Sequence, residues 1–311
     1  MIRIVGDHLA DDICRPFSHL RIEENHQAPQ LTIDFWDDQK GPNPRQIPAR
    51  ENLLWTETTV RSHNNLFVGE NLPHTFSCLN RRGGHLMASI AWRDRMFIYE
   101  RAKPLARLLL DWYNGLNLQV IHAGLVAHAG NGVIFAGKSG SGKSTTSLAC
   151  VCGGLGYLSE DYVALEQLRD GSFVGHSVYN SIFLETSHLM RFTDLIPYAI
   201  KGERPAEEKS VIVLSQVFPE RLERSVPIRA LALVRAGIAS ESRFRKASKG
   251  EALLAVGPSS LLQIPNRGLG VRGFTKLAQL VECVPCYWLE TAGDLTSIAG
   301  CVKQLLGEVT S

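Results

Sequence analysis

Apolar and polar residues follow short, strand-like patterns through the first part of the chain. Leu31–Trp36 alternates apolar with polar side chains over most of its length, and Thr56–Val60 is rich in β-branched residues. Leu86–Trp92 and Met96–Tyr99 are further apolar runs, separated by the charged segment Arg93–Arg95 in a hairpin-like arrangement. A period of two and an enrichment in β-branched residues are typical of strands. The pattern predicts a β-rich unit.

A turn-rich stretch and one amphipathic segment complete this first part. Asp37–Pro44 combines charge with glycine and proline, which is typical of an exposed loop. Pro104–Tyr113 places leucines and a tryptophan at near-helical spacing, and a proline suits the first turn of a helix. We expect this helix to close a small β-rich N-terminal domain, residues 1–117.

From residue 118 the pattern changes to apolar strands that alternate with helices, which is typical of an α/β domain. Expected strands cover Leu118–Ile121, Gly124–Ala127, Val133–Ala136, Gly156–Leu165, Pro227–Val234 and Cys286–Leu289, and expected helices follow residue 143 and cover Phe274–Val281 and Leu295–Leu306. Residues 118–311 are therefore predicted to form a second domain, with a sheet that is parallel or mixed.

One glycine-rich run carries the strongest chemical signal. It reads G-K-S-G-S-G-K-S-T and fits the pattern G-x-x-x-x-G-K-[ST]. Glycines let consecutive backbone N–H groups surround a phosphate, the lysine reaches the outer phosphates, and the hydroxyl holds Mg²⁺. The cofactors implied are ATP and Mg²⁺, although the sequence does not separate ATP from GTP. The residues expected to hold the nucleotide are Gly137, Lys138, Ser139, Gly140, Ser141, Gly142, Lys143, Ser144 and Thr145.

Both flanks of this run fit the same interpretation. Val133–Ala136 precedes it as a buried strand, and Thr146–Cys150 follows it as a helix. The N-terminus of that helix would direct its partial positive charge at the phosphates. The alternative is a loop of similar sequence that binds nothing, and such a loop would require neither flank.

An acidic pair follows the expected loop helix. Phosphoryl transfer requires neutralised charge and an acceptor held in line. Asp161 is the candidate carboxylate that orients or deprotonates the attacking hydroxyl, and Glu160 beside it could assist through Mg²⁺. A solvated strand end is the alternative, and the nearby loop favours the functional interpretation. His122 has apolar and small neighbours, which on the residues alone are more typical of a core or edge histidine.

Composition and charge narrow the classes of partner. The chain has 311 residues, of which 44% are hydrophobic and 21% charged, as in a globular protein. A formal net charge of +2 without a long basic block does not favour nucleic acid as a partner. No apolar run of membrane-spanning length and no signal peptide is evident, so we expect no membrane partner and a cytoplasmic location.

The seven scattered cysteines, Cys283 and Cys286 among them, are expected to be reduced, and this pair to be buried and structural.

The stretch His122–Leu165 resembles the catalytic domain of HPr kinase/phosphorylase and its wider relatives, in which a histidine precedes the phosphate loop and an acidic pair follows its helix. The resemblance implies an α/β fold with a P-loop nucleotide-binding domain of HPr-kinase type. It implies that Asp161, His122 and Lys143 are catalytic, with Asp161 the general base toward a seryl or other hydroxyl. It also implies a phosphate contact for Ser139.

The same resemblance suggests metal ligands. The family usually has two aspartates where this chain has Glu160 and Asp161, and it places a further glutamate near the metal. The metal candidates are therefore Ser144, Glu160 and Glu185, although Glu185 lies in no matching signature.

The N-terminal part does not resemble the corresponding domain of the bifunctional HPr enzymes, so HPr itself is not implied as the acceptor. Relatives with a small β-rich first half resemble kinases that modify ribosomally made peptides, among them lasso-peptide precursors. We therefore expect a kinase that phosphorylates a hydroxyl, with the serine of a peptide or small protein as acceptor. A small-metabolite alcohol is a second acceptor class, and an ATP-binding regulatory switch without rapid turnover is a different class of function. The family also makes a homo-oligomer plausible.

Overall fold

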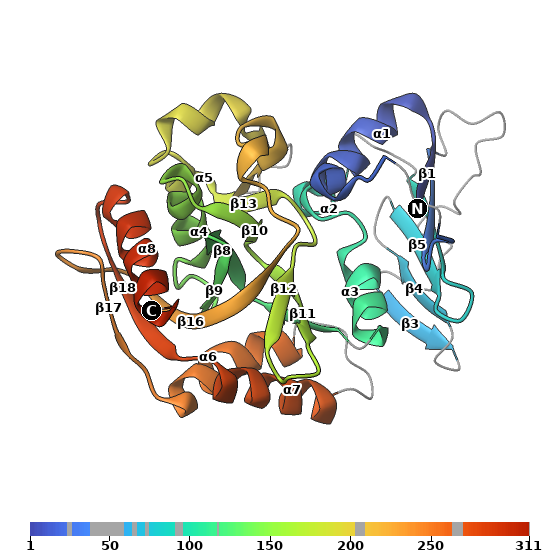
Figure 1. The fold of residues 1–311 in the computed structure, drawn as a ribbon. Coiled ribbons are helices and arrows are strands. Elements are labelled where there is room, and N and C mark those ends of the chain that lie inside the picture. Colours follow the sequence, from blue (N-terminus) through green and yellow to red (C-terminus); the bar gives the residue numbers. More distant parts are fainter. Residues whose placement is uncertain are drawn as a thin grey trace.

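The computed structural model describes residues 1–23, 27–37, 59–63, 67–71, 75–90, 96–116, 118–202, 209–262 and 270–310. Within these residues the chain forms a six-stranded sheet, a nine-stranded sheet and a three-stranded sheet, with helices between and around them (Figure 1). The architecture is mixed α/β, as the alternation of strand and helix patterns predicts.

The six-stranded sheet comes from the N-terminal part of the chain. Its strands are β1 (Ile2–Val5), β2 (Thr32–Asp37), β3 (Thr59–His63), β4 (Phe67–Asn71), β5 (Thr75–Asn80) and β6 (His85–Ile90). They are arranged in the order β1-β2-β6-β5-β4-β3, in which β1, β2 and β6 are parallel and the remaining pairs are antiparallel. Helix α1 (Asp7–Cys14) and the 3-10 helix η1 (Arg15–Leu20) follow β1. The predicted strand at Leu31–Trp36 is confirmed as β2.

The apolar run Met96–Tyr99 is not the strand that its composition predicts. Ile98–Ala102 forms helix α2 instead, and the Glu100 carboxylate accepts the Phe97 N–H at 2.9 Å in a capping arrangement. Short apolar runs do not distinguish a strand from a helix. Here the capping contact and the burial of Ile98 favour the helix. The hairpin partner of β6 is β5, which precedes it. Residues 91–95, and most of Asp37–Pro44 and Thr56–Val60, lie outside the described residues.

The predicted helix at Pro104–Tyr113 is present as α3 (Ala106–Gly115). It begins after the proline because Leu105 adopts a left-handed φ of 55° and acts as the N-cap. Its buried leucines face the first sheet, as the amphipathic spacing predicts.

The nine-stranded sheet belongs to the C-terminal part and is mixed. Its strands are β7 (Gln119–His122), β8 (Gly124–His128), β9 (Asn131–Ala136), β10 (Gly156–Ser159), β11 (Tyr162–Gln167), β12 (Phe173–His176), β16 (Ser225–Ala239), β17 (Arg243–Lys246) and β18 (Cys286–Ala292). The long strand β16 pairs with β12 at its start and then runs parallel to both β9 and β18. The segment Gly156–Leu165, expected as one strand, is divided into β10 and β11.

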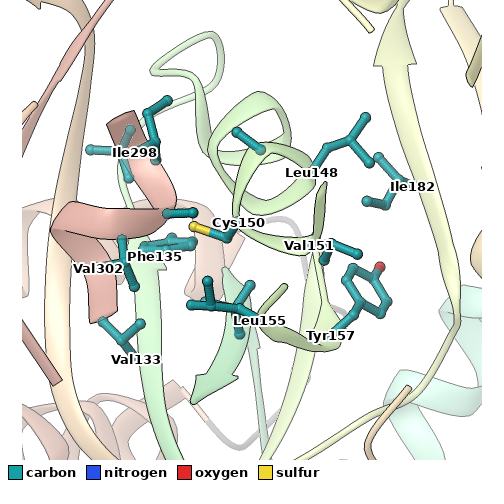
Figure 2. Packing of buried hydrophobic residues seen from close by; sticks show 14 of the residues in the cluster. Val133, Phe135, Leu148, Cys150, Val151, Leu155, Tyr157, Ile182, Ile298 and Val302 are labelled. Carbon is teal, nitrogen blue, oxygen red and sulfur yellow. The ribbon is translucent and has the colours of Figure 1, made fainter. Parts of the chain in front are cut away.

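Helices cover both faces of this sheet. On one face α4 (Lys143–Cys152) packs beside α8 (Thr296–Thr310), and on the other lie α6 (Lys249–Leu262) and α7 (Gly270–Cys283). Figure 2 shows Cys150 of α4 on the side of Phe135 of β9 and Ile298 of α8, and Leu148 on the side that faces Ile182. The helices predicted after residue 143, near Phe274 and from Leu295 are thereby confirmed. None of the helices in the described part of the chain is long and apolar enough to span a membrane.

A smaller sheet covers the α4 side. It contains β13 (Ser181–Glu185), β14 (Ile200–Lys201) and β15 (Lys209–Val213), and α5 (Thr186–Leu189) follows β13. Short 3-10 helices complete this region at Thr193–Tyr198, Leu214–Gln216 and Pro219–Arg221.

All seven cysteines are free thiols. Cys286 is buried as expected, whereas Cys283 is exposed.

The two large sheets share one apolar cluster. Leu9 and Leu86 from the first part belong to the same buried cluster as Val120, Ala164 and Tyr179 from the second. The strands of the two sheets separate near residue 117, where the sequence places a domain boundary. The boundary itself stays a prediction, because the core is continuous across it.

Candidate active site

The glycine-rich loop connects β9 to α4, between a buried strand and the N-terminus of a buried helix. Gly142 is the N-cap residue with φ 98°, and a Cβ there would lie 2.5 Å from the Cβ of Ala236. Gly137 has φ 152°, and a Cβ there would lie 2.5 Å from Ser141 Oγ. Only glycine meets both conditions without strain. The loop can therefore expose backbone N–H groups at a helix N-terminus, which is a favourable place for anions.

Lys143 is held by the loop itself. Its Nζ donates to the carbonyl oxygen of Gly137 at 2.8 Å and to that of Lys138 at 3.2 Å. Burial lowers the pKa of this lysine and nearby Lys209 adds to the effect, while the acidic pair opposes it. The ammonium is thus positioned at the loop by main-chain acceptors.

The other loop residues differ in exposure. Lys138, Ser139 and Gly140 form an exposed rim, whereas Thr145 is buried in the first turn of α4. The buried hydroxyl of Ser141 has no hydrogen-bond partner among the described residues. The rim is accessible to a ligand, whereas the Ser141 hydroxyl is buried beneath it.

The acidic pair lies in a tight bend between β10 and β11, not within a strand as the sequence suggests. Ser159 Oγ donates to the carbonyl of Tyr162 at 2.6 Å and accepts its N–H at 3.1 Å, which closes the bend. Ser144 Oγ donates to Glu160 Oε1 at 2.6 Å. The loop helix and the acidic pair therefore meet directly.

His122 joins this cluster through the register of two strands. β7 pairs with β11 so that His122 lies opposite Tyr162, and the Ala123 N–H donates to the carbonyl of Asp161 at 3.0 Å. His122 Nε2 lies 3.2 Å from Asp161 Oδ1, and the backbone N–H of His122 donates to Ser260 Oγ of α6 at 3.0 Å. Its buried Nδ1 has no partner in the part of the chain that the structure describes. His122 thus contacts the acidic pair, and its catalytic role stays a prediction.

Lys103 is the residue that sequence reasoning misses. It lies at the C-cap of α2 in the N-terminal part, and its Nζ donates to Glu160 Oε2 at 2.9 Å and to Asp161 Oδ2. Its side chain is 7% exposed. A lone lysine before a proline matches no motif, and no spacing rule links it to an acid in another sheet. Only the fold reveals it.

The charges in this cluster are strongly coupled. Burial alone would raise the pKa of Asp161, but the Lys103 ammonium and His122 outweigh it and hold that pKa well below its usual range. Burial and the neighbouring Asp161 raise the pKa of Glu160, although Lys103 and the Ser144 hydroxyl partly oppose this. Burial acts to lower the pKa of Lys103, and the two carboxylates reverse the shift. Asp161 and Lys103 are therefore both ionised near neutral pH.

The oxygens of Ser144, Glu160 and Asp161 suit a magnesium ion that also binds phosphates. Mg²⁺ typically uses one or two carboxylates and keeps waters and substrate phosphates as its other ligands. The described residues contain no group of three or more His, Cys, Asp or Glu side chains arranged to hold a metal by themselves. Glu185 ends β13 with its carboxylate 4.0 Å from His188 Nε2, and no described contact joins it to the acidic pair. A metal role for Glu185 stays a prediction.

Comparisons with known proteins relate the chain both to known sequences and to solved structures. No protein-family model matches the chain. Over 164 residues, 52% of the chain, it is 26% identical to a protein of Fusobacterium nucleatum subsp. nucleatum that is provisionally named HPr kinase/phosphorylase. The matched region spans about a quarter of that relative, 26% of its length. The structure of the Hpr(Ser) kinase/phosphatase from Coxiella burnetii aligns with 62% of this chain and 99% of its own at 12% identity, with a TM-score of 0.34. The resemblance to an HPr kinase-like family is confirmed.

Proposed function

We propose that this protein is an ATP- and Mg²⁺-dependent kinase that transfers the γ-phosphoryl group to a hydroxyl, with the serine of a peptide or small protein as acceptor. The observation that carries the proposal is the hydrogen bond between Ser144 of the glycine-rich loop and Glu160, beside the Asp161–His122 pair. A loop that only resembled a phosphate site would not need an acidic pair at its helix. The partial sequence similarity to an HPr kinase/phosphorylase supports the same reaction class.

Each residue has a role that follows from its position. The loop amides and Lys143 would bind the phosphates, and Ser144 and Glu160 would hold a magnesium ion, which would neutralise phosphate charge. Asp161 accepts the proton of the acceptor hydroxyl as its oxygen bonds to the γ-phosphorus and the bond to the β-phosphate oxygen breaks, so that ADP leaves. His122 contacts Asp161 and fixes its orientation. The low pKa of Asp161 suits a loose transition state, which demands little basicity from the base.

Two substitutions test this assignment. Asp161→Asn should retain ATP affinity and lose phosphoryl transfer by about 10²-fold or more, because the acceptor proton has no carboxylate to receive it. Lys143→Ala should weaken ATP binding itself. ATP affinity is measured by calorimetry and transfer by mass spectrometry of candidate acceptors after incubation with Mg·ATP. Asp170→Asn is the matched control, since Asp170 lies in an exposed turn bonded to Ser172.

The outcome also separates the alternatives. A gain of one phosphate on a peptide serine supports the proposal, and a gain on a small alcohol would move the acceptor to a metabolite. ATP binding without transfer to any acceptor would favour a regulatory switch. Unchanged ATP binding in the Lys143→Ala variant would contradict the site itself.

A further inference from the structure

Lys103 lies between the proposed metal ligand Glu160 and the proposed base Asp161. Its ammonium contacts one oxygen of Glu160 and one of Asp161, while Ser144 uses the other oxygen of Glu160. We propose that Lys103 is an internal counter-cation that fills this position in the absence of Mg·nucleotide, and that a divalent cation must displace it. The proposal rests on the function proposed above, because that function assigns the metal to Glu160, one of the two carboxylates that Lys103 contacts.

Burial explains why the acidic pair needs a cation of its own. The side chains of Glu160 and Asp161 are 1% and 23% exposed, and neighbouring buried carboxylates remain charged only when they are paired. The Lys143 ammonium donates its hydrogen bonds to carbonyl oxygens of the loop. Among the described residues Lys103 is the one whose ammonium contacts both acids. A lysine suits this role because its head group is a compact point charge with three donors.

Two aromatic rings lie beside Lys103 in the position that it occupies, and Lys209 Nζ also lies 4.8 Å from one of them, Phe183. Lys103 Nζ lies 5.6 Å from the ring centroid of Tyr162 and 5.7 Å from that of Phe183. Aromatic faces at such distances attract an ammonium, and the four-carbon stem of lysine can move the head group between them and the acids. A displaced Lys103 would therefore remain beside the site. Because Lys103 is the C-cap residue of α2, its displacement by a metal would change a contact of the N-terminal part.

Manganese binding without nucleotide tests the displacement directly. Mn²⁺ is the probe, because its free and bound forms differ in electron paramagnetic resonance. Lys103→Met should bind Mn²⁺ about tenfold or more tightly than the wild type, since no ammonium competes for the carboxylates. The same variant should melt at a lower temperature than the wild type without metal and regain the difference when Mn²⁺ is added. Lys103→Gln, whose amide can still donate to one carboxylate, is the second variant if Lys103→Met does not fold without metal.

Lys249→Met is the matched control. Lys249 donates to the carbonyls of Glu282 and Val284 at 3.1 and 2.8 Å, outside the site. Its loss should lower the melting temperature without any recovery by Mn²⁺.

Two results would overturn the inference: Lys103 variants that bind Mn²⁺ no more tightly than the wild type, or variants whose folding Mn²⁺ does not restore. The proposed function fails on a different measurement, namely wild-type protein that neither binds ATP nor transfers phosphate.

Discussion

Glu160 is an acidic residue whose surroundings oppose a negative charge. It is 2% exposed, and burial together with Asp161 raises its pKa. A carboxyl group whose pKa is raised by folding contributes stability below its unfolded pKa, and this contribution is lost as the pH rises through the raised pKa, because the folded state holds the proton more tightly than the unfolded chain. The proposed function gives a reason for a residue that folding alone does not favour.

Glu160→Gln should therefore raise the free energy of unfolding by about 1 kcal/mol at pH 7 while it abolishes metal-dependent phosphoryl transfer. The amide can still donate to Ser144 and accept from Lys103, so the packing is kept and the charge is removed. Urea unfolding and the transfer assay measure the two effects. Glu166→Gln, at a half-exposed pair with His176, is the control and should change stability by less than about 0.5 kcal/mol. A clear loss of stability in Glu160→Gln would contradict the argument.

At the scale of the element, the glycine-rich loop depends on the strand beside it. β16 runs parallel to β9 and continues past it, so Ala236 lies against the N-cap of α4. The loop is therefore shaped by two strands as well as by its own glycines.

Gly142→Ala should destabilise the protein by about 3 kcal/mol, because the added methyl group meets Ala236 at 2.5 Å on top of the left-handed backbone cost. Gly140→Ala is the matched control, since Gly140 also has a positive φ, 77°, but a Cβ there meets nothing within 4 Å. Its cost should be about 1–2 kcal/mol. Thermal or urea unfolding of both variants measures the difference, and equal losses would show that the contact with Ala236 does not matter.

Elements were predictable where a motif or a long period fixed them. The strand, loop and helix from Val133 to Cys150 follow from glycine spacing and apolar flanks. The strand predicted at Met96–Tyr99 was wrong, because a short apolar run does not specify the element against which it packs. The division of Gly156–Leu165 into two strands was not predicted, because the bend at Glu160 is closed by the side chain of Ser159. Lys143 and Ser144 were predictable from spacing, whereas Lys103 reaches the site only through tertiary packing.

For the whole molecule, η1 is a polar anchor between the two parts. Asn180, fully buried, donates to the carbonyl of Arg15 and to Ser18 Oγ, and Arg224 donates to the carbonyl of His19. His19 Nε2 lies 2.7 Å from Ser177 Oγ. Contacts made over long sequence separations therefore hold the N-terminal segment on the C-terminal part.

The anchor predicts a pH dependence of stability. Burial, with a smaller contribution from Arg224, lowers the pKa of His19 from 6.5 to about 4. The unfolded chain takes up this proton near pH 6.5, and the folded protein takes it up only near pH 4. The contribution of His19 to the free energy of unfolding is therefore fully present above pH 6.5 and is lost as the pH falls toward 4. His19 should contribute a loss of about 2 kcal/mol between pH 7 and pH 5.

Urea unfolding at both pH values, compared between wild type and His19→Asn, isolates this contribution. The variant should lack it, and His188→Asn, at a half-exposed histidine, should retain it. An identical pH dependence in wild type and His19→Asn would refute the prediction.

The location of Lys103 limits how this protein could be recombined with others. A chimaera that grafts residues 118–311 onto an unrelated leading module would inherit both carboxylates without their counter-ion. A replacement module would have to place a lysine at the same point, or the grafted protein would depend on divalent cations to stay folded.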